Sequence, residues 1–274
     1  MDLLTIAILV AAGAVGGFVA GLIGVGGGII FGPVLFYTLR AVGIEDPVLT
    51  PLVLGSSLFC TLVAALVSAR AQWLRGAIRP RVAGIGGGFA ALAVVAMTTF
   101  VTTQPWYDAR AFQLVLGLLL VFVAVRMLLA KKNAEPLAAS ERAGLAPLAV
   151  TGAAAGAVAA AAGVGGGVVM VPAYHRLLRL PMLAASGTST ATIVLISATG
   201  VATYALRGLS ADVPGLALGY VHLGYALPLV IPVLLTARLG VSAAHRLPVV
   251  AVRRAFAAFA LLVAGNLLWE ALLA

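Results

Sequence analysis

A glycine-rich pentapeptide occurs twice in this chain and carries the residues best suited to bind a ligand. The first copy runs from Gly24 to Gly28 and reads GVGGG, and the same five letters return from Gly163 to Gly167. Glycine tolerates backbone angles that free N–H groups from regular structure and lets a ligand approach the main chain closely. Free N–H groups and the start of a following helix favour an anion. We therefore predict an anion site at Gly26, Gly27, Gly28, Gly165, Gly166 and Gly167.

Hydroxyl side chains at matching places in the two copies are the next candidates for this site. They follow each glycine motif, at the start of a long apolar run, and their O–H groups could donate to anionic oxygens. The same residue types also cap helices or bond back to a carbonyl one turn earlier, so both interpretations stay open. The residues are Ser56, Ser57, Thr188, Ser189 and Thr190.

Two ionisable side chains are secondary candidates. His222 lies inside an apolar run. An ionisable group there is a functional hypothesis by default, although a neutral histidine bonded to a neighbouring helix is the alternative. Arg176 lies at the end of a short apolar segment. From there its side chain could reach the substrate or extend to the membrane interface.

The acidic residues argue against cation transport and catalysis. All eight Asp and Glu residues fall in expected loops or at chain ends. No carboxylate is therefore expected at membrane depth to build a metal site or a proton relay. The chain also lacks the HExxH, GxSxG and P-loop patterns of metalloproteases, hydrolases and nucleotide-driven pumps. We expect no enzyme activity, no metal and no cofactor.

Composition sets the class of protein that must position these residues. Of the 274 residues, 63% are hydrophobic and only 9% are charged. So few charges cannot cover a water-exposed surface. Several apolar runs reach the roughly 20 residues that span a bilayer core. The net charge of +9 comes from basic residues in short loops. Such residues orient membrane proteins, so we expect no nucleic-acid partner. The fold class is therefore an all-α polytopic membrane protein.

The two glycine motifs belong to a longer internal repeat, and each repeat contains five hydrophobic segments. We expect a first transmembrane repeat over residues 1–130, a cytoplasmic connector over 131–144 and a second repeat over 145–274. The segments that follow the glycine motifs are too short to cross a bilayer and predict half-helices. The expected segments are 3–22, 29–40, 48–69, 82–101, 110–129, 145–162, 168–178, 183–206, 215–236 and 254–273.

An odd number of segments inverts the second repeat relative to the first. Clusters of Arg and Lys after the third, fifth and ninth segments then fall on one side of the membrane. The positive-inside rule makes this side the cytoplasm. We therefore predict an N-terminus outside. A re-entrant path for the two short segments would change the number of crossings.

The repeated motif resembles a known family. GLIGVGGGIIFGPVL and AAGVGGGVVMVPAY, each followed by a Gly-(Ser/Thr)-Ser step, are similar to the TauE/SafE sulfite exporter family over essentially the whole chain. The resemblance implies a carrier of the bacterial inner membrane that moves sulfite, sulfoacetate, sulfolactate or related anions, mostly outward. The copies differ in detail, since Phe31-Gly32 faces Met170-Val171 and Tyr37 faces Arg176, so the two half-sites are not equivalent.

We therefore expect a secondary transporter that exports a small sulfur-containing anion by alternating access between the two repeats. A passive small-anion channel and a structural membrane subunit are the alternatives. The expected partners are the anion and the lipid bilayer, with a homodimer as a candidate assembly. The expected location is the bacterial inner (plasma) membrane, which the chain crosses several times.

Overall fold

The computed structural model describes residues 2–129, 144–244 and 249–273. Within these ranges the chain forms ten α-helices, a short π-helix and a two-stranded hairpin, which confirms the predicted all-α class. The connector expected over 131–144 lies outside the described residues except for Gly144. The elements are α1 (Leu3–Ile23), α2 (Gly28–Ala41), α3 (Leu49–Trp73), α4 (Pro80–Met97), η1 (Thr98–Thr102), α5 (Ala109–Leu129), α6 (Leu145–Ala162), α7 (Gly167–Arg176), α8 (Met182–Arg207), β1 (Ala217–Leu218), β2 (Val221–His222), α9 (Leu223–Ala244) and α10 (Val249–Leu273).

The helices present an apolar surface suited to lipid. Seven of the helices in the described part of the chain are long and apolar enough to cross a membrane. Large aliphatic side chains point outward from them, including Leu4, Leu92 and Leu235, each at least 68% exposed. In water such a surface would be unfavourable, whereas lipid tails solvate it, so the chain is a multi-pass membrane protein.

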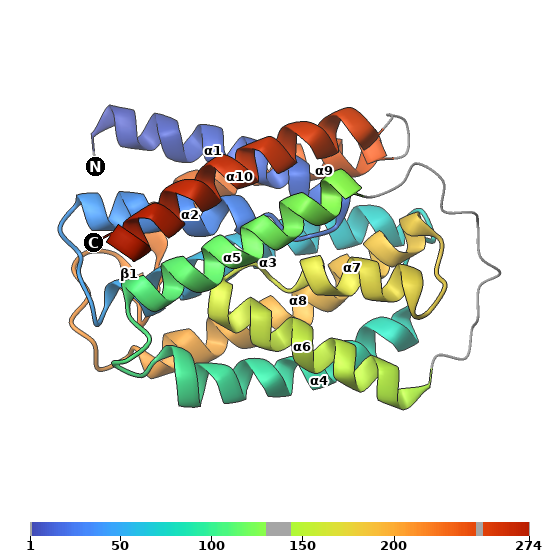
Figure 1. Cartoon of the computed structure of the whole chain (residues 1–274), viewed down its shortest axis with the longest axis horizontal. Coiled ribbons are helices and arrows are strands. Elements are labelled where there is room, and N and C mark those ends of the chain that lie inside the picture. The colour runs from blue at the N-terminus through green and yellow to red at the C-terminus, as the bar shows by residue number, and fades with distance from the viewer. Residues whose placement is uncertain (1, 130–143, 245–248, 274) are drawn as a thin grey trace.

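Each glycine motif forms a loop inside the bundle and joins two helices into a hairpin. In Figure 1, α1 starts at the end of the bundle that carries the N-terminus, and α2 returns to that same end. The hairpin of α6 and α7 enters from the opposite end and returns to it. The remaining long helices, α3, α4 and α5 in the first half and α8, α9 and α10 in the second, run between the two ends.

The loop conformation explains why glycine stands at these positions. Gly24 and Gly163 end the first helix of each hairpin with φ of 76° and 67°. Gly27 and Gly166 precede the second helix with φ of 75° and 76°. These left-handed angles cost other residues about 1–2 kcal/mol each, so glycine permits both chain reversals.

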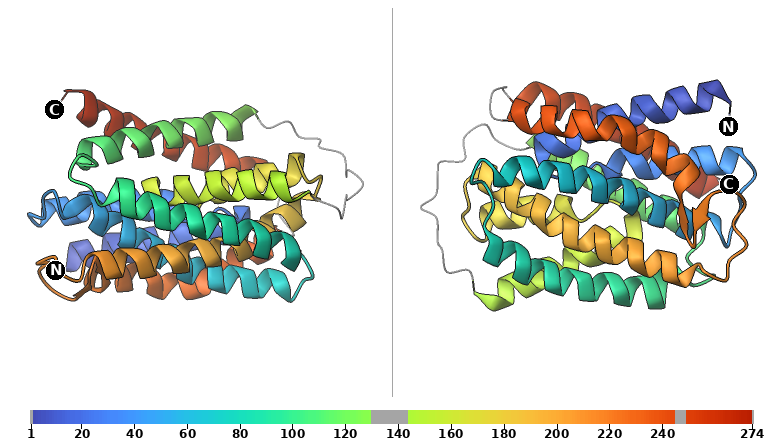
Figure 2. Two further views of the ribbon diagram at one scale, coloured as in Figure 1. Left: turned by 90° about the horizontal axis from the view of Figure 1, so that it is seen from below. Right: turned by 180° about the vertical axis from the view of Figure 1, so that it is seen from behind.

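The two halves pack against each other through equivalent pairs of helices. The first helix of each half lies along the fourth helix of the other, α1 against α9 and α6 against α4. Helices α3 and α8 cross at the centre, and α5 lies along α10, as Figure 2 shows from two further sides. The α1–α9 and α6–α4 interfaces are therefore counterparts of each other. The α3–α8 and α5–α10 interfaces each pair equivalent helices of the two halves.

Small residues allow the closest of these contacts. A Cβ on Gly13 of α1 would collide with the backbone of Leu229 in α9. At the repeat-equivalent position in α6, a Cβ on Gly152 would collide with the backbone of Gly86 in α4. Matching glycines thus serve helix packing in both halves, as in other membrane bundles.

One expected segment is shifted along the chain, by eight residues at each end. The helix expected over 215–236 begins at Leu223, and the residues before it form the β1–β2 hairpin. Gly215 and Gly219 adopt φ of 88° and 54°. A right-handed helix needs negative φ, so the chain turns twice before α9 starts. His222 consequently lies in β2 and not within a membrane-spanning helix.

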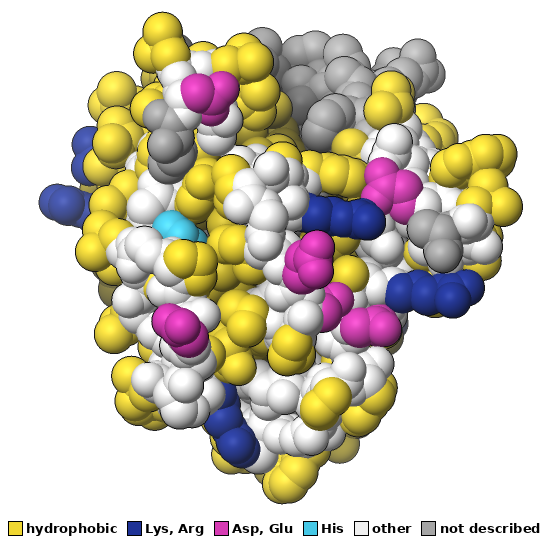
Figure 3. Space-filling model, turned by 90° about the vertical axis from the view of Figure 1, so that its left-hand side faces the viewer, with side chains coloured by type: hydrophobic (Ala, Val, Ile, Leu, Met, Phe, Trp, Pro, Cys, Tyr) yellow, Lys and Arg dark blue, Asp and Glu magenta, His cyan; other side chains and the backbone are white. Residues whose placement is uncertain are grey.

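The described acidic side chains lie at one end of the bundle. Figure 3 shows them on the end face that carries the N-terminus, together with several Lys or Arg side chains. All Asp and Glu residues in the described ranges belong to elements at this end: Asp2, Glu45, Asp46, Asp108, Asp212 and Glu270. The opposite end carries exposed arginines on either side of the α3–α4 and α7–α8 connections, such as Arg75, Arg81 and Arg179.

Candidate functional site

The two glycine loops meet each other in the interior of the bundle. A Cβ built on Gly28 would lie 2.6 Å from the Cα of Val164, and one built on Gly167 would lie 2.6 Å from the Cα of Val25. Both distances are shorter than real Cβ contacts allow, so the main chains of the two loops touch. The structure therefore brings all six predicted glycines into one buried place.

Backbone N–H groups in these loops have no acceptor. Within the described ranges, the N–H groups of residues 25–27 and 164–166 donate no hydrogen bond, although all these residues are buried. Buried N–H groups are paired in the great majority of cases. Successive N–H groups around left-handed glycines form concavities that bind anions, so unpaired N–H groups at the loop contact are the donors such a ligand needs.

Two of the predicted hydroxyls connect the loops across the halves. Ser57 in α3 donates to the carbonyl oxygen of Gly163 at 2.8 Å, and Ser189 in α8 donates to the carbonyl oxygen of Gly24 at 3.1 Å. Each serine thus holds the carbonyl at the end of the first helix of the other half. In this conformation both protons are used by the protein, so these hydroxyls position the loops.

The remaining predicted hydroxyls also have protein partners. Ser56 accepts a hydrogen bond of 2.8 Å from the N–H of His222, directly before α9. Thr188 accepts one of 3.0 Å from the N–H of Arg79, directly before α4. Thr190 donates to a carbonyl one turn earlier in α8. These three side chains therefore bond at a helix start or back to a carbonyl of their own helix, which was the alternative role considered from the sequence.

Thr61 is a further candidate residue for the site that the sequence analysis missed. Its side chain is fully buried, and its Oγ1 has no hydrogen-bond partner in the described part of the chain. A Cβ on Gly26 or Gly165 would lie 2.9 or 2.6 Å from the methyl group of Thr61, so this side chain lies between the two loops. Its position one turn after Ser57 on the same helix face was the available signal.

The two halves differ at this central position. The repeat counterpart of Thr61 is Ile193 in α8, and its side chain contacts the same two glycines, Gly26 and Gly165. One half thus contributes an unpaired hydroxyl and the other an apolar wall. Ser197, one turn after Ile193, adds a second buried hydroxyl without a partner among the described residues.

Comparison with known proteins shows the family of this chain. The sequence pattern of the family described as Sulfite exporter TauE/SafE matches residues 9–267. The chain belongs to this family. Membership confirms that it is a membrane transporter and agrees with the expectation that it is not an enzyme.

Two relatives of this TauE/SafE transporter are each described as a probable membrane transporter protein. A probable membrane transporter protein of Haemophilus influenzae is 29% identical over 93% of this chain and 95% of its own length. A probable membrane transporter protein of Methanocaldococcus jannaschii is 26% identical over 87% of this chain and 86% of its own length. No solved structure shows a significant match to the chain.

The secondary candidates of the TauE/SafE chain lie away from the loop contact. His222 is buried in the hairpin at the end of the bundle, and burial lowers its pKa, so the ring is neutral at pH 7. Arg176 is exposed at the last residue of α7. In the described ranges no group of His, Cys, Asp and Glu side chains could hold a metal ion.

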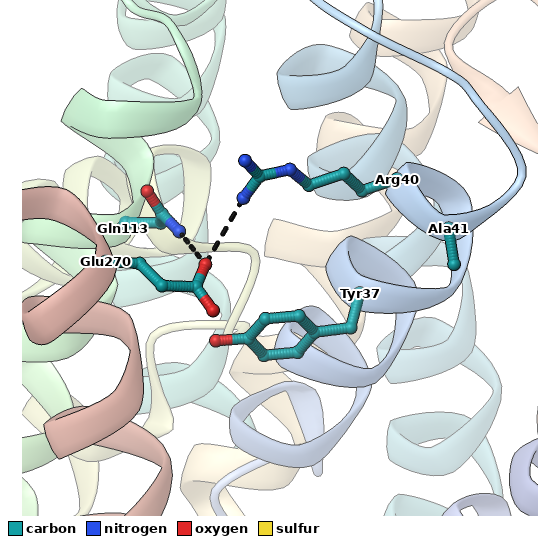
Figure 4. A pocket seen from close by; sticks show the side chains of 5 residues that line it. All are labelled: Tyr37, Arg40, Ala41, Gln113 and Glu270. Carbon is teal, nitrogen blue, oxygen red and sulfur yellow. Dashed lines mark hydrogen bonds and ion pairs between the residues drawn. The ribbon is translucent and has the colours of Figure 1, made fainter. Parts of the chain in front are cut away.

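A second polar place in the TauE/SafE chain is an open pocket of about 390 Å³ between α2, α5 and α10. Figure 4 shows Arg40 and Gln113 both directed at the carboxylate of Glu270, with distances of 3.2 and 2.9 Å. The hydroxyl of Tyr37 donates to Asn266. Because the carboxylate neutralises the guanidinium, this pocket offers an anion no net charge, and the loop contact remains the better candidate.

Proposed function

We propose that this protein is a secondary transporter that exports a small sulfur-containing anion, either sulfite or an organosulfonate such as sulfoacetate. The observation that carries the proposal is the contact of the two glycine loops, where buried N–H groups and the Thr61 hydroxyl have no partner in the described ranges. The anion would accept hydrogen bonds from these groups. The protein would lie in the bacterial inner membrane.

The electrostatics of the loop contact support an anion over a cation. Helices α2 and α7 both start at the loops. The N-terminal end of a helix carries a partial positive charge of about half an elementary charge. Broken helices meeting near the membrane midplane present their N-termini to anionic substrates in inverted-repeat transporters. No carboxylate of the described residues lies near the loops, since all are at one end of the bundle.

The dense packing at the loops favours alternating access over an open pore. Thr61 fills the space between Gly26 and Gly165, and the cavity beside the first loop measures only about 20 Å³ with an apolar lining that includes Val25 and Gly27. An anion can enter such a site only if the two halves move relative to each other. Two equivalent interfaces join the halves, α1 with α9 and α6 with α4. We expect the halves to move relative to each other at these interfaces.

We also propose an inverted arrangement with the N-terminus outside. Each glycine hairpin returns to the end from which it entered, and three long helices follow it, so each half crosses the membrane an odd number of times. The end with the exposed arginines of the α3–α4 and α7–α8 connections would lie in the cytoplasm, by the positive-inside rule. The acidic end face would then lie outside.

The test is transport by purified protein in liposomes. A carrier should show saturable counterflow, in which internal sulfoacetate accelerates the uptake of labelled sulfoacetate. Thr61→Val removes one donor at constant shape and should weaken binding roughly tenfold to hundredfold, as expected for a hydrogen bond to a charged group. Its melting temperature should stay near wild type, because Oγ1 has no partner to lose in the described ranges.

Three outcomes would contradict parts of this proposal. Ohmic currents without counterflow would indicate a passive channel, and no flux of any anion would favour a structural subunit. Normal binding by Thr61→Val would exclude the central hydroxyl as a ligand. Thr203→Val is the matched control, because its hydroxyl donates only to a carbonyl one turn earlier in α8.

A further inference from the structure

Two polar side chains near the end of α3 are buried without a hydrogen-bond partner. Ser68 and Gln72 are fully buried, and neither the serine Oγ nor either polar atom of the glutamine amide has a partner among the described residues. Burying an amide without a partner is unfavourable, so buried polar groups almost always have a hydrogen-bond partner. An amide and a hydroxyl left unpaired one turn apart can therefore donate hydrogen bonds to a polar ligand.

These two residues extend the line of polar groups that passes the glycine loops. Ser57, Thr61, Ser68 and Gln72 follow one another along α3 at spacings of four, seven and four. Such spacings place them on one face of the helix. All four are fully buried. From Thr61 to Gln72 the helix rises roughly 16 Å. The line thus leads from the loop contact to the end of the bundle opposite the N-terminus.

The equivalent two positions in α8 carry no unpaired donor. The repeat counterparts of Ser68 and Gln72 are Gly200 and Tyr204. The Tyr204 hydroxyl donates to the carbonyl of Ala160 at 2.9 Å and pairs with the Thr102 hydroxyl at 2.6 Å. The Tyr204 phenol is therefore paired within the protein, whereas the amide of its counterpart Gln72 has no partner among the described residues.

We propose that Ser68 and Gln72 form a second contact point for the transported anion, between the glycine loops and the end of the bundle that carries the α3–α4 connection. This inference rests on the proposed function. The glutamine NH2 and the serine hydroxyl would donate to an oxygen of the passing sulfite or sulfonate. Neutral donors suit a site on the route of a transported anion, because the anion must also leave that site. A positively charged side chain would hold the anion too tightly.

The first test replaces the amide by an apolar side chain of similar size. Gln72→Leu should slow sulfoacetate counterflow in liposomes at least tenfold, while the dissociation constant for sulfoacetate at the central site stays within about twofold. The melting temperature should stay the same or rise, because an unpaired buried amide is removed. Thr203→Val again controls for loss of a polar group outside the line.

Two results of this test would overturn the proposal. Wild-type counterflow by Gln72→Leu would show that the amide does not contact the substrate. A lower melting temperature with unchanged counterflow would show that the amide has a purely structural partner. If wild-type protein itself does not exchange sulfoacetate, the proposed function fails, and the accessibility test below still decides whether anions reach this line.

The second test measures access directly and does not depend on transport. In a Cys60→Ala background, Ser68→Cys and Gln72→Cys should react with an anionic methanethiosulfonate reagent, and sulfoacetate should slow the reaction. Cys60 of the wild type is the built-in control, because it is the single cysteine of the chain. It lies in α3 outside the polar line, with its thiol directed at the Ala226 carbonyl oxygen of α9, and should stay unreactive. Unreactive thiols at both positions would overturn the proposal.

Discussion

Ser57 donates a 2.8 Å hydrogen bond to the carbonyl oxygen of Gly163, although the two residues lie 106 positions apart in different halves of the chain. The reciprocal bond runs from Ser189 to Gly24. Each long central helix thus holds the end of the other half's glycine hairpin. The position of each loop therefore depends on a helix of the other half, so both repeats are needed to form the loop contact.

The first prediction concerns these two serines. Ser57→Ala and Ser189→Ala should each lower the free energy of unfolding by about 1–3 kcal/mol, because each leaves a buried carbonyl without its donor. Thermal unfolding in detergent, compared with Thr203→Val, measures this loss. Unchanged melting temperatures with a large loss of sulfoacetate affinity would instead show that the hydroxyls bind substrate, as the sequence alone allowed.

The second prediction separates backbone strain from packing at the glycine loop. Gly27→Ala should destabilise the protein by more than the roughly 1–2 kcal/mol that a left-handed residue costs. The reason is that its Cβ would lie 2.8 Å from both the Gly16 carbonyl oxygen and the Phe31 ring. Gly43→Ala is the control, since Gly43 has φ of 85° and no atom within 4 Å of an added Cβ. Equal losses in thermal unfolding would mean that packing at Gly27 contributes nothing.

The third prediction concerns topology. In a Cys60-free variant, single cysteines near Arg79 and Ala243 should be labelled from the cytoplasmic side, and one near Asp212 from the outside. Impermeant thiol reagents applied to intact cells and to inverted vesicles measure this. Labelling at Arg79 and Asp212 from the same side would contradict the inverted arrangement.

The fourth prediction concerns the pocket at Arg40 and Glu270. Glu270→Gln should leave sulfoacetate counterflow near the wild-type rate, because we propose that the substrate passes the glycine loops and not this pocket. The two side chains are 52% and 32% exposed. Exposed ion pairs contribute little, so the substitution should change stability by at most about 1 kcal/mol. A strong loss of counterflow with normal melting would move the substrate route to this pocket.

The sequence by itself determined the class of protein, the internal repeat and the presence of two glycine loops. Composition excludes a water-exposed surface, and two GVGGG motifs within a longer matching register require two similar loops. Glycine at Gly27 and Gly166 could be explained from the sequence, because few other residues adopt the left-handed angles of such turns. The start of α9 could not, since the hairpin before it contains apolar residues that resemble a helix.

Only the tertiary structure decided which groups meet. Ser57 follows the first glycine motif in the sequence, but the serine binds the loop of the other half. Thr61 carried no mark in the sequence beyond its helical spacing, and its importance comes from being enclosed by Gly26 and Gly165 without a partner among the described residues. Periodicity reports which face of a helix is apolar, whereas hydrogen bonds between distant segments depend on how the two halves pack.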